Sequence, residues 1–258
     1  MKNKICGKQK THFFCDLDHT LIYSHRVPIH NDKRVVEELH GESQSFMTEK
    51  TYEFFLTQKI VQLVPVTTRS REQYERISVL QKDFPSQYAL ICNGGVLLIN
   101  GCEDRTWNTE TLSIISHELS DLEYAKKVVE RLIPRTQIHD VNMMFFYAKH
   151  DTPDVFAARL KQELSSSSIQ VLHDNRKVYC LPRGLHKGNA IERFKKRFSV
   201  TKSIGAGDSI FDVPMLNAVD TALFPTGIDH LIKTKEKIRI SDQVFSDGIC
   251  GYLETLKR

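Results

Sequence analysis

The chain has 258 residues, of which 40% are hydrophobic and 26% charged, and it carries a net charge of +4. These values are typical of a soluble globular protein with one large domain or two smaller ones. The basic residues are scattered and form no stripe, which argues against a dedicated nucleic-acid-binding protein. We therefore expect no nucleic-acid partner.

The cysteines and the N-terminus indicate in which cellular compartment the protein is expected. The six cysteines are dispersed and form no CxxC pair, which argues against a disulfide framework or a cysteine metal site. The N-terminus is polar and lacks the apolar core of a signal peptide, and no apolar run approaches the length of a bilayer span. We expect a cytoplasmic protein that has no membrane partner.

The first third of the chain alternates apolar strands with amphipathic helices. Thr48 and Ser70 are hydroxyl residues of the kind that cap helix N-termini. The polar segment 23–46 between the first strand and the first helix is interpreted as a long irregular loop, and such loops often have a function. The expected order is strand 12–16, helix 48–58, strand 59–67, helix 71–82 and strand 88–92. This alternation is typical of a parallel sheet with helices on its faces.

The pattern changes after the turn at Asn93-Gly94-Gly95. The next segment favours hairpins over crossovers, which indicates an α+β domain inserted at 94–183. Its expected elements are a hairpin at 96–101, a helix over 109–133, a strand at 143–148, a helix over 153–164 and strands at 169–173 and 177–181.

After residue 183 the first rhythm resumes. The expected elements are helix 188–198, strand 202–207, helix 212–218, short strands at 220–224 and 243–245, and a closing helix at 251–257. The predicted fold class is therefore α/β. A doubly wound parallel sheet is formed by 1–93 and 184–258, and the α+β domain is inserted into it.

Two carboxylates follow the first predicted strand at once. Asp16 and Asp18 are two residues apart, so an extended chain points both side chains the same way. Carboxylates this close repel each other unless a cation or a shared proton lies between them, and Mg²⁺ is the usual oxygen-bound cation. The alternative is a solvated turn after a buried strand, where aspartate is common.

Further polar residues lie at or beside the ends of the other predicted strands, where open parallel sheets bind their ligands. They are Thr67, Thr68, Lys187, Asp208 and Asp212. Each alone has an ordinary explanation: a threonine can end a strand, a lysine can lie on the surface, and an aspartate can cap a helix. Their occurrence together, in this order, is the stronger signal.

In this order the motifs resemble the haloacid dehalogenase superfamily of Mg²⁺-dependent phosphohydrolases, whose core is a Rossmann-like sheet. The inserted segment is similar to the large α/β cap of the sugar-phosphatase branch, which includes Cof-type, sucrose-phosphate and mannosyl-3-phosphoglycerate phosphatases and has phosphomannomutases as relatives. The matching residues are Asp16-Leu-Asp18-His-Thr20, Thr67-Thr-Arg69, Lys187-Gly188 and Gly207-Asp208-Ser209-Ile-Phe-Asp212.

The resemblance implies a role for each motif. Asp16 would be the nucleophile that forms an aspartyl phosphate, and Asp18 the general acid and then base. Thr67 and Lys187 would hold the phosphoryl oxygens. The Mg²⁺ cofactor would be held by Asp16, Asp208 and the backbone carbonyl of Asp18. Two further residues would support this site: Asp212, through a water-mediated metal contact or by fixing Lys187, and Ser209 from behind the metal ligands.

The chain departs from the family pattern at two glycine positions. His19 replaces one glycine, so we expect this loop to avoid positive φ. Thr68 replaces the glycine of the common Thr-Gly-Arg triplet, which leaves either threonine as the phosphate ligand. The position of Arg69 favours Thr67.

Substrate choice is expected to come from the cap, which would close over the site. The candidate contacts are polar residues at predicted turn or strand ends, and for each the alternative is plain cap surface. They are Arg105, His150, Arg176 and Arg183.

The leading hypothesis is a phosphatase that hydrolyses a small phosphorylated metabolite, a sugar phosphate or a related phosphorylated acid. One alternative is a phosphomutase of the phosphomannomutase type, which would return the phosphoryl group to another hydroxyl. Another is a non-catalytic regulatory or binding protein on the same scaffold. A monomer or a homodimer is expected.

Overall fold

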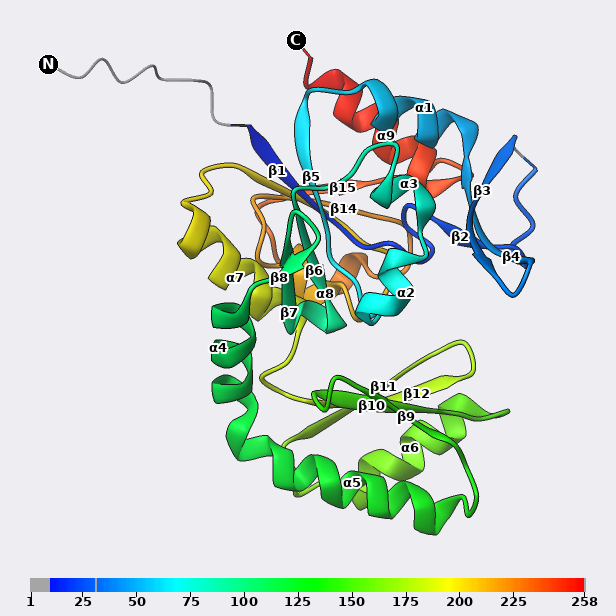
Figure 1. Ribbon diagram of the computed structural model, residues 1–258, viewed down its shortest axis with the longest axis vertical. Coiled ribbons are helices and arrows are strands. Elements are labelled where there is room, and N and C mark those ends of the chain that lie inside the picture. Colours follow the sequence, from blue (N-terminus) through cyan, green and yellow to red (C-terminus); the bar gives the residue numbers. More distant parts are fainter. Residues whose placement is uncertain (1–9, 31, 258) are drawn as a thin grey trace, which may run out of the picture.

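The computed structural model describes residues 10–30 and 32–257 (Figure 1). The N-terminal segment for which no signal peptide is predicted lies largely outside this range, as does Cys6. The five cysteines in the described part of the chain are free. None of the helices described combines the length and the apolar composition that a bilayer span requires.

The centre of the fold is a five-stranded parallel sheet in the order β15-β14-β13-β1-β5, as the α/β prediction requires. Its strands are β1 (Thr11–Cys15), β5 (Val61–Pro65), β13 (Ser203–Ala206), β14 (Thr221–Phe224) and β15 (Glu236–Arg239). β1 lies between β13 and β5 and is buried on both faces, which explains its continuous apolar sequence.

Helices cover both faces of this sheet. Phe13 points into a cluster with the first group of helices, and its neighbour Phe14 points into a second cluster with Phe194 and Leu216, because successive strand residues face opposite sides. The first group is α1 (Glu49–Thr57), α2 (Arg71–Glu75), α3 (Ser78–Gln81) and α9 (Phe245–Thr255). The second is α7 (Lys187–Phe198) and α8 (Val213–Leu216).

The segment interpreted as an irregular loop at 23–46 is instead a small antiparallel sheet, so that prediction is wrong. Its strands, in the order β2-β4-β3, are β2 (Tyr23–Ser24), β3 (Lys33–Leu39) and β4 (Glu42–Thr48). His40 and Gly41 form the tight turn, with φ of 54° and 79°, and Leu39 pairs with Glu42 across it. A two-residue turn with positive φ at both positions suits the twist of a hairpin.

A second antiparallel group lies beside the end of β5. Its strands are β6 (Tyr88–Ile91), β7 (Val96–Ile99) and β8 (Cys102–Glu103), and Leu90 of β6 forms a single parallel bridge with Val66. α4 (Arg105–Ile115) follows and packs Trp107 into the same cluster as Phe14. The indole Nε1 of Trp107 donates to the Gly94 carbonyl at 3.0 Å.

The remaining sheet is antiparallel, in the order β11-β12-β10-β9. Its strands are β9 (Ile138–Val141), β10 (Phe145–Lys149), β11 (Ile169–Asp174) and β12 (Lys177–Pro182). One face packs on α5 (Leu119–Leu132) and α6 (Pro153–Glu163), and the other turns toward the parallel sheet (Figure 1). We call this sheet with its two helices the cap. The predicted domain limits of 94 and 183 stay a prediction, and Trp107 packs with the core.

Two predicted elements near the chain's middle and end need correction. The helix expected over 109–133 is interrupted by a 3₁₀ turn, Ser116–Glu118, between α4 and α5. The strand expected at 243–245 is wrong, because Phe245 begins α9 and the last strand is β15. β15 is an edge strand with charged residues, and so it lacks the apolar run of a central strand.

Candidate active site

A small pocket of about 40 Å³ opens at the carboxyl ends of β1 and β13. Cys15 pairs with Ala206 at the ends of these parallel neighbours, so the residues that follow, Asp16 and Asp208, come together. The pocket is lined by Asp16, Asp18, His19, Thr68, Asp174, Tyr179, Lys187, Asp208, Ser209 and Phe211. A larger cavity of about 690 Å³ lies between α1 and α9, away from these carboxylates.

Lys187 joins two of the carboxylates from widely separated parts of the chain. Its Nζ donates to Asp16 Oδ1 at 2.5 Å and to Asp212 Oδ1 at 2.6 Å, and its side chain is 1% exposed. Burial opposes the charged ammonium, but the two carboxylates outweigh it and raise the pKa of Lys187. Of the two roles considered for Asp212, the direct contact with Lys187 is therefore present.

Three carboxylates lie close enough together to share one cation. Single oxygens of Asp16, Asp208 and Asp212 lie within 4.8 Å of one another. Burial, then repulsion from Asp212, raises the pKa of Asp16 well above its usual value, and the same causes raise the pKa of Asp208 to about 7. Repulsion of this kind among buried carboxylates favours a bound divalent cation, and an all-oxygen donor set fits Mg²⁺.

The loop after β13 is shaped around Asp212. Its Oδ2 accepts from the backbone N–H of Asp208 at 3.2 Å, and from the N–H and hydroxyl of Ser209 at 3.0 and 2.8 Å. A Cβ at Gly207 would lie 2.3 Å from the Asp212 Cβ, so only glycine fits there. Thr20 donates to Asp208 Oδ1 at 3.0 Å and so ties this loop to the one after β1.

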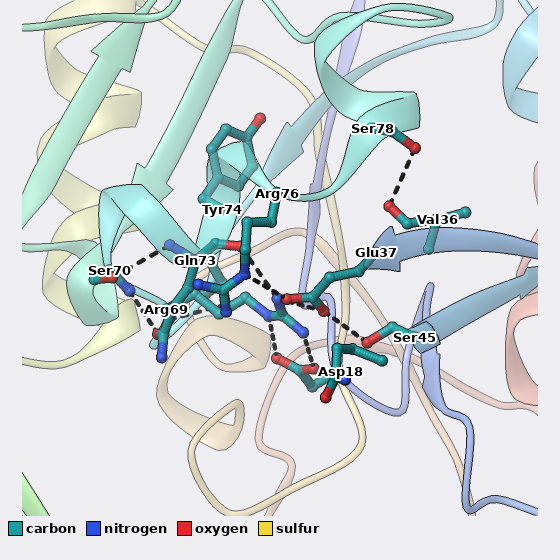
Figure 2. A network of polar contacts seen from close by, with 12 residues as sticks. Asp18, Val36, Glu37, Ser45, Arg69, Ser70, Gln73, Tyr74, Arg76 and Ser78 are labelled. Carbon is teal, nitrogen blue, oxygen red and sulfur yellow. Dashed lines mark hydrogen bonds and ion pairs between the residues drawn. The ribbon is translucent and has the colours of Figure 1, made fainter. Parts of the chain in front are cut away.

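Asp18 faces the pocket but is held by an arginine. Arg69 donates from Nε and Nη2 to the two carboxylate oxygens at 2.9 and 2.8 Å (Figure 2). Burial opposes ionisation of Asp18, but Arg69 outweighs it, and the pKa of this carboxyl is lowered. In the described state Asp18 is therefore an ionised, bidentate partner of Arg69.

The model of one protein family, described as haloacid dehalogenase-like hydrolase, matches residues 56–224, more than half of the chain. The chain belongs to this family. The match contains Lys187, Asp208 and Asp212, while Asp16 and Asp18 lie before it. A search of curated proteins gives no significant match.

Solved structures similar to this hydrolase share its fold over almost the whole chain. The sucrose-phosphatase of Synechocystis, in complex with sucrose and phosphate, is 14% identical with a TM-score of 0.63 over 96% of this chain and 98% of that one. The subclass IIB sugar phosphatase BT4131 is 12% identical, with a TM-score of 0.62 over 96% and 99%. A trehalose-6-phosphate phosphatase related protein is 17% identical, with a TM-score of 0.56 over 96% and 98%.

The structure bears on both positions at which the chain departs from the family pattern. His19 adopts φ of 60°, so the prediction that this loop avoids positive φ is wrong. The loop keeps the left-handed conformation with a non-glycine residue, held by the His19 N–H bond to the Ile22 carbonyl at 2.8 Å. Thr68 lines the pocket, whereas Thr67 is fully buried and its Oγ1 accepts from the Arg69 N–H at 3.2 Å. The phosphate role of Thr67 stays a prediction.

The four residues proposed as substrate contacts do not line the pocket described above, and their role stays a prediction. Arg105 begins α4 and is exposed, and His150 accepts from the Thr152 N–H at 3.1 Å. Arg176 forms an exposed ion pair with Asp151, and Arg183 lines another cavity.

The cap residues that reach the pocket are instead Asp174 and Tyr179, which the sequence analysis missed. The Tyr179 ring contacts the Phe211 ring at 5.0 Å between centroids, which joins the cap to the loop after β13. Lys177 and Tyr179 are two residues apart in β12, so their side chains lie on the same face of the strand. This spacing was the available sequence signal for a side chain that faces the pocket.

Proposed function

We propose that the protein is a Mg²⁺-dependent phosphatase that hydrolyses a small phosphorylated metabolite through an aspartyl phosphate on Asp16. The observation that carries the proposal is the contact of Lys187 with Asp16 and Asp212, beside Asp208, at one small pocket. A buried lysine beside clustered carboxylates provides a nucleophile, a fixed positive charge and a cation site within one pocket.

Hydrolysis would take two displacements at phosphorus. A carboxylate oxygen of Asp16 forms a bond to phosphorus while the bond to the leaving alkoxide breaks, and the alkoxide takes a proton from Asp18. Asp18 takes up that proton from solvent beforehand, when one of its oxygens exchanges its hydrogen bond from Arg69 for the leaving-group oxygen. A water molecule then gives a proton to Asp18 and attacks the same phosphorus, which releases inorganic phosphate and restores Asp16. Lys187 holds the phosphoryl oxygens throughout, where negative charge is concentrated.

The carboxylate cluster fits the cofactor that the family resemblance implies. Asp16 and Asp208 would hold Mg²⁺ together with the backbone carbonyl of Asp18, while Asp212 stays on Lys187. When bound, the ion would offset the charge of the phosphoryl oxygens and of the clustered carboxylates. Thr20 would keep Asp208 in place through its hydrogen bond.

The substrate class we propose is a sugar phosphate or a related phosphorylated acid. Asp174 and Tyr179 of the cap line the pocket and offer a polar leaving group a carboxylate and a phenol as hydrogen-bond partners. The names of the similar structures support the same class, since two of them are a sucrose-phosphatase and a sugar phosphatase.

The test is phosphate release from a panel of sugar phosphates and phosphorylated acids, measured with excess Mg²⁺ and again with EDTA. Release is expected with Mg²⁺ and is expected to fall by about 10²-fold or more with EDTA, because the carboxylate cluster then has no counter-ion. Restoring Mg²⁺ should restore the rate. Equal release with and without EDTA would refute the metal requirement, and no release from any compound would refute the proposed activity.

The binding of Mg²⁺ should depend on pH through Asp208. Its pKa is raised to about 7, by burial and by Asp212, so below that pH a proton occupies a metal ligand. Calorimetry on the metal-free protein should therefore give a Kd about tenfold weaker near pH 6 than near pH 8.

The same pKa fixes the sign of the effect on stability. The folded protein binds this proton more tightly than the unfolded chain, so without metal the free energy of unfolding should fall as pH rises from about 4 through about 7. Added Mg²⁺ should reverse the loss near pH 8. A Kd that is constant between these pH values would contradict the assignment of Asp208 as a ligand.

A further inference from the structure

The β3–β4 hairpin buries one carboxylate for which the proposed mechanism has no role. Glu37 is 4% exposed, whereas its neighbour Glu38 on the same strand is exposed. A buried carboxylate requires partners, because an unpaired charge away from water is costly. Its partners lie outside the hairpin as well as within it.

A β-bulge aims Glu37 inward. Val35 pairs with Phe46 and Glu37 pairs with Ser45, so Val36 is an extra residue in β3. The carbonyl of Val36 accepts from the Ser78 hydroxyl at 3.2 Å (Figure 2). As a result Val36 and Glu37 are both buried, although consecutive strand residues normally face opposite sides.

Both carboxylate oxygens of Glu37 are occupied. Oε2 accepts from Ser45 Oγ at 2.7 Å and from Arg69 Nη1 at 2.9 Å, and Oε1 accepts from Arg76 Nε at 3.1 Å. Ser45 and Arg76 therefore fix the carboxylate from the hairpin and from the end of α2. Glu37 in turn fixes one edge of the Arg69 guanidinium.

The opposite edge of that guanidinium holds the pocket residue. Arg69 Nε and Nη2 donate to the two oxygens of Asp18, so Arg69 lies between the two carboxylates, as Figure 2 shows. Its side chain is 12% exposed, and its Nη1 also donates to the Gln73 carbonyl at 3.2 Å. The orientation of Asp18 at the pocket is thus set by an arginine whose own orientation is set by Glu37.

We propose that Glu37 is a positioning residue for the phosphatase reaction: through Arg69 it holds one oxygen of Asp18 in place while the other oxygen, released from Arg69 and protonated, passes its proton to the leaving alkoxide. This inference rests on the proposed function. Glutamine at this position keeps the shape but replaces one acceptor oxygen by an NH₂ group that cannot accept from an arginine. Either Arg69 or Arg76 then loses its acceptor. In both cases the support of the Arg69 guanidinium is weakened, directly or because Glu37 is no longer fixed from the end of α2, and Asp18 loses its defined place at the pocket.

The test is kcat/KM of Glu37→Gln on two kinds of phosphate monoester. An alkyl phosphate chosen from the panel leaves as an alkoxide and needs the proton from Asp18, whereas p-nitrophenyl phosphate leaves as a stable phenolate and does not. kcat/KM reports only the steps up to departure of the leaving group, so later hydrolysis of the aspartyl phosphate does not enter. We expect a loss of about 10- to 100-fold with the alkyl ester and less than about 3-fold with the aryl ester.

Both esters are measured on the same preparation, so an inactive fraction of protein cancels in the ratio of the two values. Ser45→Ala, which removes one donor to Glu37, should change the ratio in the same direction by a smaller factor. Glu38→Gln makes the same chemical change at the exposed neighbour and should leave the ratio unaltered.

An unchanged ratio for Glu37→Gln, whether both rates fall equally or neither falls, would overturn the positioning role. Such a result would leave the proposed function standing. Absence of release by the wild-type protein from both esters is a different result, because it would refute the proposed function itself and the role of Glu37 with it.

Discussion

Replacing Asp16 by asparagine is expected to lower kcat for phosphate release by about 10⁴-fold or more. An amide oxygen is a poor nucleophile and cannot form an aspartyl phosphate, so the loss should be the same for every substrate of the panel. The fold should persist, because the asparagine side chain would have the same shape and could still accept from the Lys187 ammonium, which now donates to Asp16 Oδ1.

The covalent intermediate provides a second measurement. Acid quenching of wild-type protein during turnover of a substrate labelled in its phosphoryl group should leave label on the protein. Hydroxylamine should release that label, as it does from acyl phosphates, and Asp16→Asn should carry none. Asp154→Asn, the same change at an exposed position on the cap helix α6, should behave as wild type. Phosphate release that survives Asp16→Asn would refute the nucleophile assignment.

The core of the site was predictable because parallel strands leave a strong pattern. Residues of β1 are buried on both faces, so an apolar run ends abruptly at Asp16, and a polar residue there is conspicuous. Asp16 and Lys187 are 171 residues apart in the sequence. They meet because β1 pairs with β13, the strand that follows α7. The alternation of strands and helices predicted a parallel sheet with polar residues at the carboxyl ends of its strands, but not the order of those strands.

The hairpin at 33–48 was missed because its strands do not show the pattern of a half-buried sheet. Its residues carry charge on both faces, and the bulge at Val36 breaks the period of two. The spacing of residues along the sequence does not show that Asp18 pairs with Arg69 either. The motif match includes both residues, but which partner a guanidinium takes depends on packing in three dimensions.

The break between α4 and α5 and the pocket residues of the cap also depend on tertiary contacts. The 3₁₀ turn contains neither glycine nor proline, and its Glu118 carboxylate accepts from the Gly184 N–H at 3.2 Å, a contact across 66 residues. Asp174 and Tyr179 reach the pocket through the way in which the cap sheet sits over it. The break has no local sequence signal, and the spacing of Lys177 and Tyr179 does not show which face of the cap sheet turns toward the pocket. The four polar residues chosen by sequence do not line this pocket, and their role stays a prediction.

Replacing Lys187 by methionine is expected to lower kcat by about 10³-fold and the free energy of unfolding by about 3–5 kcal/mol near neutral pH. The activity falls because the fixed charge on the phosphoryl oxygens is lost. The stability falls because Asp16 and Asp212, 7% and 0% exposed, are left facing each other without the ammonium between them. Chemical denaturation at several pH values measures the second effect.

The pH dependence of that loss separates electrostatic repulsion from poor packing. Burial and repulsion from Asp212 already raise the pKa of Asp16, and without the Lys187 ammonium that pKa should rise further above its unfolded value, so the folded variant gains a proton as pH falls. The destabilisation should therefore be larger near pH 8 than near pH 5, and Mg²⁺ should reduce it near pH 8. Lys196→Met, at an exposed position of the same helix, should change neither activity nor stability appreciably. A loss for Lys187→Met that is equal at both pH values would show that packing, and not the paired charges, accounts for the role of Lys187 in the fold.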